Sequence, residues 1–225
     1  MSQFRVKAIM FDLDGTLINS APEIAFAVNQ MLADLNLPAL SQSQITHFIG
    51  EGAQVLIKRC LTGQLNVEPD KDQFEQAQTL FFAHYAKVVG NSQPYDGVIA
   101  GLQQIWRRGF KLACVTNKPE KFTLPLLQQS GLADFFDCVV SGDSLPEKKP
   151  HPMPLQHVCK KLEVPEYESM LVGDSNTDIA AAHAAGCFII TVPYGYNQGK
   201  PIDESKVDES INDLTELSNF IELLT

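Results

Sequence analysis

The chain has 225 residues, 44% of them hydrophobic, with a formal net charge of -10 and an isoelectric point near 4.9. This composition is typical of a globular protein, and its acidity argues against a nucleic-acid partner, which would need a basic surface. No apolar run reaches the ~18–20 residues of a membrane span, and the short apolar stretch near the N-terminus is too short for a signal-peptide core.

The five cysteines are scattered, odd in number and without a Cys-x-x-Cys pair. This spacing favours neither a disulfide framework nor a zinc site. We therefore expect buried, reduced thiols in a cytoplasmic protein that has neither a membrane nor a nucleic acid as its partner.

The N-terminal part of the sequence predicts one strand followed by helices. Residues 4–11 alternate and then become fully apolar, as in a strand that enters a buried sheet. Ser20 and Glu23, with a proline between them, have the spacing of a capping box at the start of a helix. The pattern then predicts further helices at 53–61 and 72–89 and no convincing strand.

After residue 94, predicted helices and strands alternate with short connections. The helices are expected at 98–108, 120–130, 153–162, 176–185 and 213–224, and the strands at 110–116, 137–141, 169–172 and 187–192. This alternation predicts an α/β fold with a Rossmann-like parallel sheet and helices on both faces. We expect residues 1–18 and 93–225 to form this core, and residues 19–92 to form an inserted α-helical cap domain.

Polar side chains gather where the predicted strands end. The four clusters are Asp12 with Asp14, Thr116 with Asn117, Lys148 with Lys149, and Asp174 with Asp178. Ligands of open α/β sheets bind outside the carboxyl ends of the strands, so we expect these clusters to meet at one edge.

The carboxylates of this edge predict a metal site. Asp12, Asp14 and Asp174 would repel one another unless a cation or protons intervened. Oxygen ligands of this kind suit Mg²⁺, which typically binds one or two carboxylates, several waters and substrate phosphate. Asp178 would lie where it could orient Lys149 or contact the water shell of the metal.

The remaining polar groups favour a phosphorylated substrate. The Thr116 hydroxyl, the Asn117 amide and the Lys149 ammonium are donors suited to phosphate oxygens. No thiol or Ser/His pair accompanies them, which favours a carboxylate nucleophile and an aspartyl-phosphate intermediate. The expected partner is therefore a small phosphorylated metabolite.

Four motifs carry a family resemblance: DLDGTL (12–17), VTN (115–117), KP (149–150) and GDSNTD (173–178). In this order and on strand ends, they resemble the motifs of the haloacid dehalogenase superfamily. The helical block after the first motif looks like the small cap domain of that superfamily. The resemblance covers nearly the whole chain.

The resemblance implies a role for each residue of the acidic motifs. Asp12 would attack phosphorus and become phosphorylated. Asp14 would protonate the leaving oxygen and then activate water, while its backbone carbonyl binds Mg²⁺. Asp12 and Asp174 would supply the side-chain metal ligands, with Gly15 and Thr16 as supporting residues.

The same resemblance implies how the phosphoryl group is held. Thr116 and Asn117 would bind it, and Lys149 would offset the negative charge on it and on Asp12. Asp178 would support Lys149.

Longer matches narrow the expected activity. These segments are SAPEI (20–24), GEGA (50–53), VTNKP (115–119), KKPHP (148–152), GDSNTDIAAAHAAG (173–186) and YGYN (194–197). They resemble phosphatases that act on 2-phosphoglycolate, which implies an Mg²⁺-dependent phosphomonoesterase that releases glycolate and phosphate.

The cap is expected to select the substrate, because the four motifs handle only the phosphoryl group. Glu51 and Gly52 would form a loop that dips toward the site, and Arg59 is a candidate for contact with a small carboxylate. The segment 194–197 is expected to be a surface loop rather than part of the site.

Other functions remain open at this point. They are a phosphatase for another small ester or for pyrophosphate, a sugar-phosphate mutase of the same superfamily, and a non-catalytic phospho-switch. Relatives that cleave C–P bonds usually have alanine at the position of Asp14, and P-type ATPases have threonine there, so Asp14 favours phosphoester chemistry. A monomer or a small homo-oligomer is expected.

Overall fold

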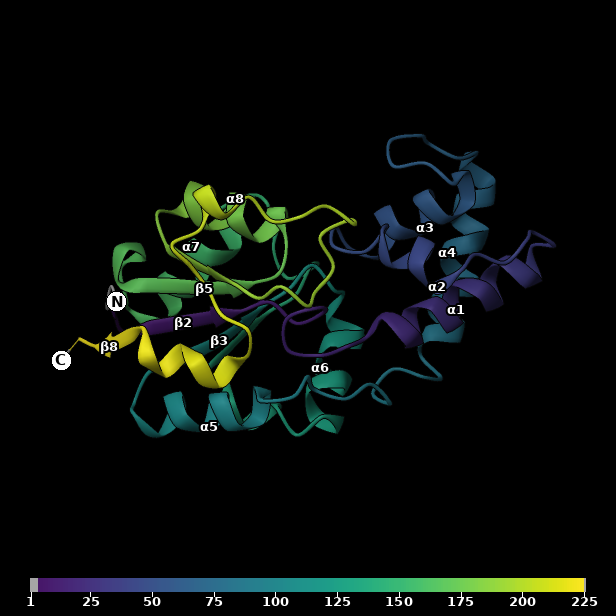
Figure 1. Ribbon diagram of the computed structural model, residues 1–225. Helices are drawn as coiled ribbons and strands as arrows, with labels where there is room; N and C mark the ends of the chain where they lie inside the picture. Colours follow the sequence, from purple (N-terminus) through teal and green to yellow (C-terminus); the bar gives the residue numbers. More distant parts are fainter. Residues whose placement is uncertain (1–3, 225) are drawn as a thin grey trace.

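The computed structural model describes residues 4–224 of the protein, and its centre is a six-stranded parallel sheet (Figure 1). Its strands lie in the order β4–β3–β2–β5–β6–β7. Their bounds are β2 Ala8–Phe11, β3 Lys111–Val115, β4 Cys138–Val140, β5 Ser169–Gly173, β6 Phe188–Thr191 and β7 Glu209–Ser210. The central strands are almost wholly apolar because helices bury both faces of the sheet.

Successive residues of each strand point to opposite faces and join two hydrophobic clusters. Ile9 and Phe11 of β2 pack with α5 (Val98–Arg107), α6 (Glu120–Gln129) and the 3₁₀-helix η4 (Leu214–Asn219). Ala8 and Met10 pack on the other side, with α7 (Met153–Leu162) and α8 (Asn176–Ala185). This confirms the predicted α/β fold, a parallel sheet with helices on both faces.

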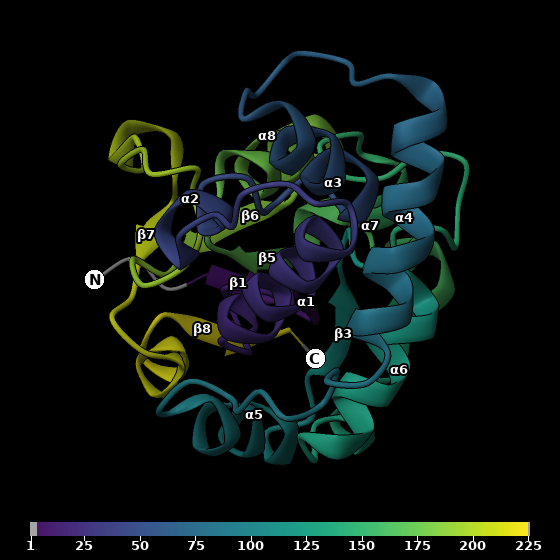
Figure 2. The same ribbon diagram turned by 90° about the vertical axis from the view of Figure 1, so that its right-hand side faces the viewer.

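Helices α1–α4 form a second group with its own hydrophobic cluster. They span Ala21–Asp34, Gln42–Thr46, Ala53–Thr62 and Lys71–Tyr85. Figure 1 shows them together at one end of the sheet, and Figure 2, which views the molecule from that end, shows them in front of it. None of the described helices combines the length and the apolarity needed to cross a bilayer.

The chain passes twice between the sheet core and these helices, and the two passages lie side by side. Ile18 forms an isolated antiparallel bridge with Pro94. The backbone NH of Asn19 donates to Gln93 O (3.2 Å), and that of Tyr95 donates to Leu17 O (3.1 Å). The helical insertion therefore leaves and returns through one hydrogen-bonded pair of segments.

Both ends of the chain differ from the prediction. The expected strand 4–11 is two strands, because the backbone NH of Lys7 turns to Glu168 O (2.8 Å) and separates β1 (Phe4–Val6) from β2. The expected helix 213–224 is wrong: it is η4 followed by β8 (Ile221–Leu223), which pairs in parallel with β1. The apolar residues of this segment have helix-like spacing because they pack against α5. The open edge of β1 then allows the last residues to pair as a strand.

Smaller elements also differ. Helix α4 ends at Tyr85, with turns where the prediction extends the helix to 89. Helix α2 and strand β7 were not predicted; the remaining 3₁₀-helices are η1 (Ala133–Phe135), η2 (Glu166–Glu168) and η3 (Glu204–Lys206). All five cysteines are free and buried, as predicted.

Candidate active site

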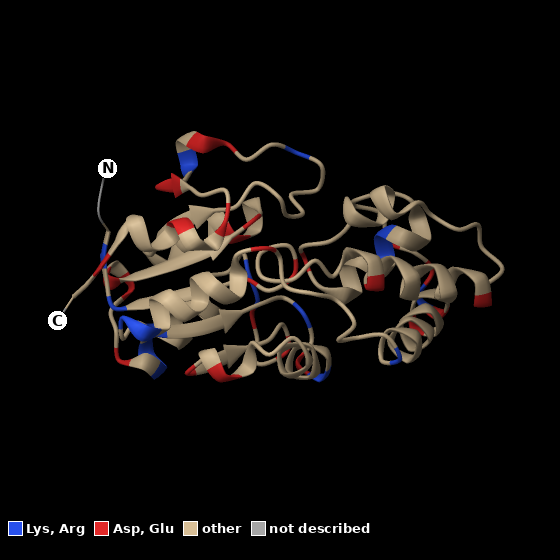
Figure 3. Cartoon of the chain, turned by 60° about the horizontal axis from the view of Figure 1, so that its bottom comes forward, with Lys and Arg blue, Asp and Glu red and all other residues tan. Residues whose placement is uncertain are grey.

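The polar clusters meet at the carboxyl edge of the sheet, under the helical insertion. Asp12 follows β2, Thr116 follows β3, and Asp174 follows β5, which are neighbouring strands. Lys149 comes from the loop between β4 and α7. Figure 3 shows acidic and basic segments at this junction between the sheet and the helices.

Asp12 lies beside a buried cation. Lys149 is 2% exposed, and its Nζ is 3.0 Å from an oxygen of Asp12 and 2.6 Å from one of Asp178. The second oxygen of Asp178 accepts a hydrogen bond from the Ser175 hydroxyl (2.6 Å) in the capping box of α8. Burial raises the pKa of Asp12 to about 6, although Lys149 lowers it. Helix α8 thus fixes the lysine that faces the proposed nucleophile.

Removing this cation is expected to destabilise the fold. Lys149→Met leaves Asp12 and Asp178 without their buried partner, and breaking such a pair costs about 3 kcal/mol or more. Urea unfolding measures the loss, with the exposed Lys160→Met as the control for a change of net charge. A difference below about 1 kcal/mol between the two variants would contradict the importance of this contact.

Asp174 completes an acidic cluster. Thr16 Oγ1 donates to one of its oxygens (2.8 Å), and the backbone NH of Tyr196 donates to the other. Oxygens of Asp12, Asp174 and Asp178 lie within 4.8 Å of one another. Burial, with Asp178 and Asp12 nearby, raises the pKa of Asp174 well above its usual value. A cation would relieve this repulsion, and the all-oxygen donor set fits Mg²⁺.

Gly15 is required by this arrangement. Its φ of +93° suits glycine, and a Cβ there would collide with the Asp174 carboxylate. Its neighbour Thr16 is fully buried and bonded to Asp174. Both supporting residues of the first motif therefore lie beside the acidic cluster.

Asp14 points away from the acidic cluster. Its carboxylate accepts from Lys118 Nζ (2.9 and 3.0 Å) and from the Ser20 hydroxyl (2.6 Å). The expected capping box at Ser20 is wrong, because that hydroxyl is used here and Glu23 instead accepts from the backbone NH of Ser92. The sequence assigned only the backbone carbonyl of Asp14 to the metal, and the Asp14 side chain lies outside the group of three acids that could hold a cation.

Thr116 and Asn117 line the pocket next to Asp12. Asn117 Nδ2 donates to the backbone oxygens of Lys149 (2.9 Å) and Gly50 (3.1 Å). The amide expected to hold a phosphoryl group is therefore bonded to two loops in this structure. It links the Lys149 loop to the segment that precedes α3.

The predicted cap residues divide into two groups. Gly52 lines the pocket, close to the backbone of Asn117. Arg59 is 4% exposed and does not line it: its guanidinium donates to Glu51 (2.5 Å), Phe48 O and Leu65 O. The expectation that Arg59 meets a substrate carboxylate is thus corrected, because its donors hold the helical insertion together.

The segment 194–197 was predicted to be a surface loop, and this is wrong. Gly195 lies so close to Asp174 that a Cβ would collide with it. The Tyr196 ring is buried, and its hydroxyl donates to Asn19 (2.8 Å) and accepts from the backbone NH of Ala21 (3.0 Å). The loop therefore joins the acidic cluster to the start of α1.

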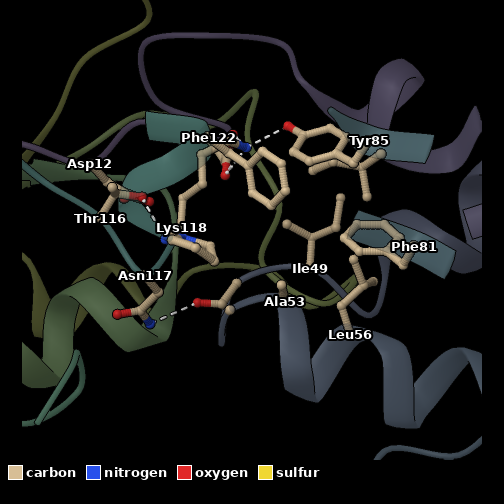
Figure 4. Close-up of a pocket in the computed structure, with 15 residues that line it drawn as sticks. Asp12, Ile49, Ala53, Leu56, Phe81, Tyr85, Thr116, Asn117, Lys118 and Phe122 are labelled. Carbon is tan, nitrogen blue, oxygen red and sulfur yellow. Dashed lines mark hydrogen bonds and ion pairs between the residues drawn. The ribbon is translucent and has the colours of Figure 1, made fainter. Parts of the chain in front are cut away.

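The pocket itself lies between the sheet edge and the helices (Figure 4). It encloses about 50 Å³, enough for a few waters at about 10–15 Å³ each. Asp12, Asp14, Thr116, Asn117 and Lys118 provide its polar wall, and the opposite wall is apolar: Ile24, Ile49, Leu56, Phe81 and Phe122. Lys118, which sequence reasoning did not assign to the site, directly follows the Thr116–Asn117 pair.

Fold and site together describe an α/β protein with a polar pocket at the carboxyl edge of its sheet, covered by an inserted helical block. The profile of the family described as haloacid dehalogenase-like hydrolase matches residues 9–192. The chain belongs to the haloacid dehalogenase-like hydrolases, as the sequence motifs predicted.

The chain is also similar to proteins named phosphoglycolate phosphatase. It is 46% identical over 217 residues to that of Thiobacillus denitrificans and 47% identical over 218 residues to that of Nitrosospira multiformis, with 96% of each chain covered. The crystal structure of a predicted phosphoglycolate phosphatase from Haemophilus somnus superposes with a TM-score of 0.90 at 39% identity. That comparison covers 95% of this chain and 97% of the other.

Proposed function

We propose that the protein is a phosphomonoesterase that hydrolyses 2-phosphoglycolate to glycolate and phosphate through an aspartyl phosphate. The observation that carries this proposal is Asp12, which lines the pocket with Lys149 Nζ 3.0 Å from its carboxylate. Relatives named phosphoglycolate phosphatase, 46–47% identical over 96% of the chain, support the substrate.

In this mechanism Asp12 attacks phosphorus and the bond to the leaving oxygen breaks. Lys149 offsets negative charge on the phosphoryl group. Asp14, held by Ser20 and Lys118, enters the first step protonated and gives that proton to the leaving oxygen. It then takes a proton from the water that attacks the aspartyl phosphate, which restores its protonated form for the next cycle. Thr116 and Asn117, which line the pocket, would bind the phosphoryl group.

Asp12 and Asp174 would hold Mg²⁺, together with the Asp14 backbone carbonyl. When bound there, the ion lowers the repulsion between a carboxylate nucleophile and a dianionic phosphate ester. Asp178 stays bonded to Lys149 and Ser175, so it acts through that lysine.

Metal binding is expected to stabilise the protein measurably. At a Mg²⁺ concentration about 100-fold above Kd, the melting temperature should rise by roughly 5–10 °C, because the ion binds the folded state only. Asp174→Asn should remove this shift together with activity, and EDTA should reverse both in the wild type. An unchanged shift in Asp174→Asn would contradict the ligand assignment.

Residues 19–92 act as the cap in this proposal, since α1, α3, α4 and the segment before α3 provide most of the apolar wall of the pocket. Within the described residues 4–224, the apolar wall of the pocket offers no polar side chains to the hydroxyl groups of a sugar ring. This favours a small ester over the substrate of a sugar-phosphate mutase.

The test is a panel of phosphate esters with purified enzyme. We expect the highest kcat/KM for 2-phosphoglycolate, no activity without Mg²⁺, and one inorganic phosphate released per glycolate. Two phosphates per turnover would indicate pyrophosphate as the substrate, and transfer to a sugar without phosphate release would indicate a mutase. Either result would refute the proposal.

A further inference from the structure

Lys118 is a buried cation in the wall of the pocket. It is 5% exposed, and among residues 4–224 it is the one lysine or arginine that lines the cavity. Its Nζ lies 2.9 and 3.0 Å from the two oxygens of Asp14 and donates to the Tyr85 hydroxyl (2.6 Å). Figure 4 shows Lys118 and Tyr85 reaching toward each other across the pocket from opposite walls.

This lysine is charged. Burial lowers the pKa of Lys118, but Asp14 and Tyr85 more than offset that effect and bring it above its usual value. Asp14 is the carboxylate in direct contact with the ammonium, and burial raises the pKa of the Tyr85 hydroxyl well above its usual value, so Tyr85 is neutral. The three hydrogen-bond contacts of the ammonium go to the two Asp14 oxygens and the Tyr85 hydroxyl, so an anion on the cavity side would take the place of one Asp14 oxygen.

The position of Lys118 matches the geometry of the substrate. In 2-phosphoglycolate one methylene separates the leaving oxygen from the carboxylate. Asp14 protonates that oxygen, so the carboxylate must fall within a few ångströms of Asp14, where Lys118 Nζ lies. Elsewhere the leaving group would meet Ile49, Leu56 and Phe81, and a carboxylate buried there would be unpaired and costly.

We propose that Lys118 and the Tyr85 hydroxyl bind the substrate carboxylate and so determine specificity for an anionic two-carbon leaving group. This inference rests on the proposed function. Lys118 follows β3 of the core, whereas Tyr85 ends α4 of the insertion. Recognition of the carboxylate therefore requires the sheet core and the helical insertion to be in contact.

The experiment compares two esters that differ only in the carboxylate, 2-phosphoglycolate and ethyl phosphate. The readout is the ratio of their kcat/KM values, because a residue that merely positions Asp14 would change both values equally. We expect Lys118→Met to lower the ratio about 100-fold, mostly through KM, and Tyr85→Phe to lower it about tenfold. Lys118→Arg should retain part of the ratio because it keeps the charge.

Lys121→Met is the matched control, since this exposed lysine lies on α6, three residues further on. It should leave the ratio unchanged. If Lys118→Met lowers kcat/KM equally for both esters, the inference is overturned. If Lys118→Met does not fold, Tyr85→Phe provides the same test. If the wild type itself does not distinguish the two esters, the proposed substrate is wrong and the inference falls with it.

Discussion

Asp12→Asn is expected to abolish turnover, with a loss of about 10⁴-fold or more in kcat. Asparagine keeps the shape of the side chain but cannot form an aspartyl phosphate, so neither step of the reaction can follow. Release of inorganic phosphate from 2-phosphoglycolate measures the loss. Acid quenching during turnover should trap a phosphorylated protein in the wild type and none in the variant.

Asp72→Asn is the matched control for this change. Asp72 is exposed in the first turn of α4 and does not line the pocket. Asp72→Asn therefore removes the same charge as Asp12→Asn without changing the pocket. It should retain full activity. A rate in Asp12→Asn within tenfold of the wild type would refute the assignment of Asp12 as nucleophile.

Asp14→Asn is expected to divide the two chemical steps. Its steady-state rate should fall by about 10²–10⁴-fold, because water is no longer activated to attack the aspartyl phosphate. With p-nitrophenyl phosphate the first step needs little acid assistance, since p-nitrophenolate is a good leaving group. We therefore expect a burst of about one equivalent of p-nitrophenol, followed by slow turnover.

Ser20→Ala separates the chemical role of Asp14 from its orientation. It removes the 2.6 Å hydrogen bond to Asp14 and leaves the carboxylate in place. A modest loss without a burst is expected. If Asp14→Asn shows neither a burst nor a phosphorylated protein, the first step is blocked as well. That result would contradict the assignment of Asp14 as the base that activates water in the second step.

Most of the sheet could be predicted because its strands are buried on both faces. Ile9, Met10 and Phe11 are fully buried, so neither face of the strand accommodates a polar side chain. A continuous apolar run of this kind therefore indicates a strand. The helix predicted for the C-terminal segment was wrong. Leu214, Leu217 and Ile221 have helical spacing, but β8 pairs with the open edge of β1 instead. Such pairing depends on a partner more than 200 residues away, which local pattern does not contain.

The site could be predicted to the extent that it lies at strand ends. The carboxyl ends of β2, β3 and β5 meet because the strands are parallel neighbours, so Asp12, Thr116 and Asp174 had to converge. Lys118 and Tyr196 were missed because their roles depend on tertiary contacts with Tyr85 and Asn19. A lysine directly after the Thr–Asn pair was the one local signal for the first of them.

The paired passages at 17–19 and 93–95 make the helical insertion exchangeable as one unit. The insertion leaves and returns at neighbouring points, so its length does not change the geometry of the sheet. The entropic cost of closing such a loop rises only slowly with its length. Another segment with adjacent ends could replace this insertion at the same two points and give the same phosphoryl-transfer core a new range of substrates. In such an exchange Asp12, Lys149 and Asp174 would stay in place, while Asp14 would lose Ser20 and Lys118 would lose Tyr85. Under the proposed role of Lys118 and Tyr85, selection for new leaving groups would then act on the contacts between insertion and core without altering the nucleophile.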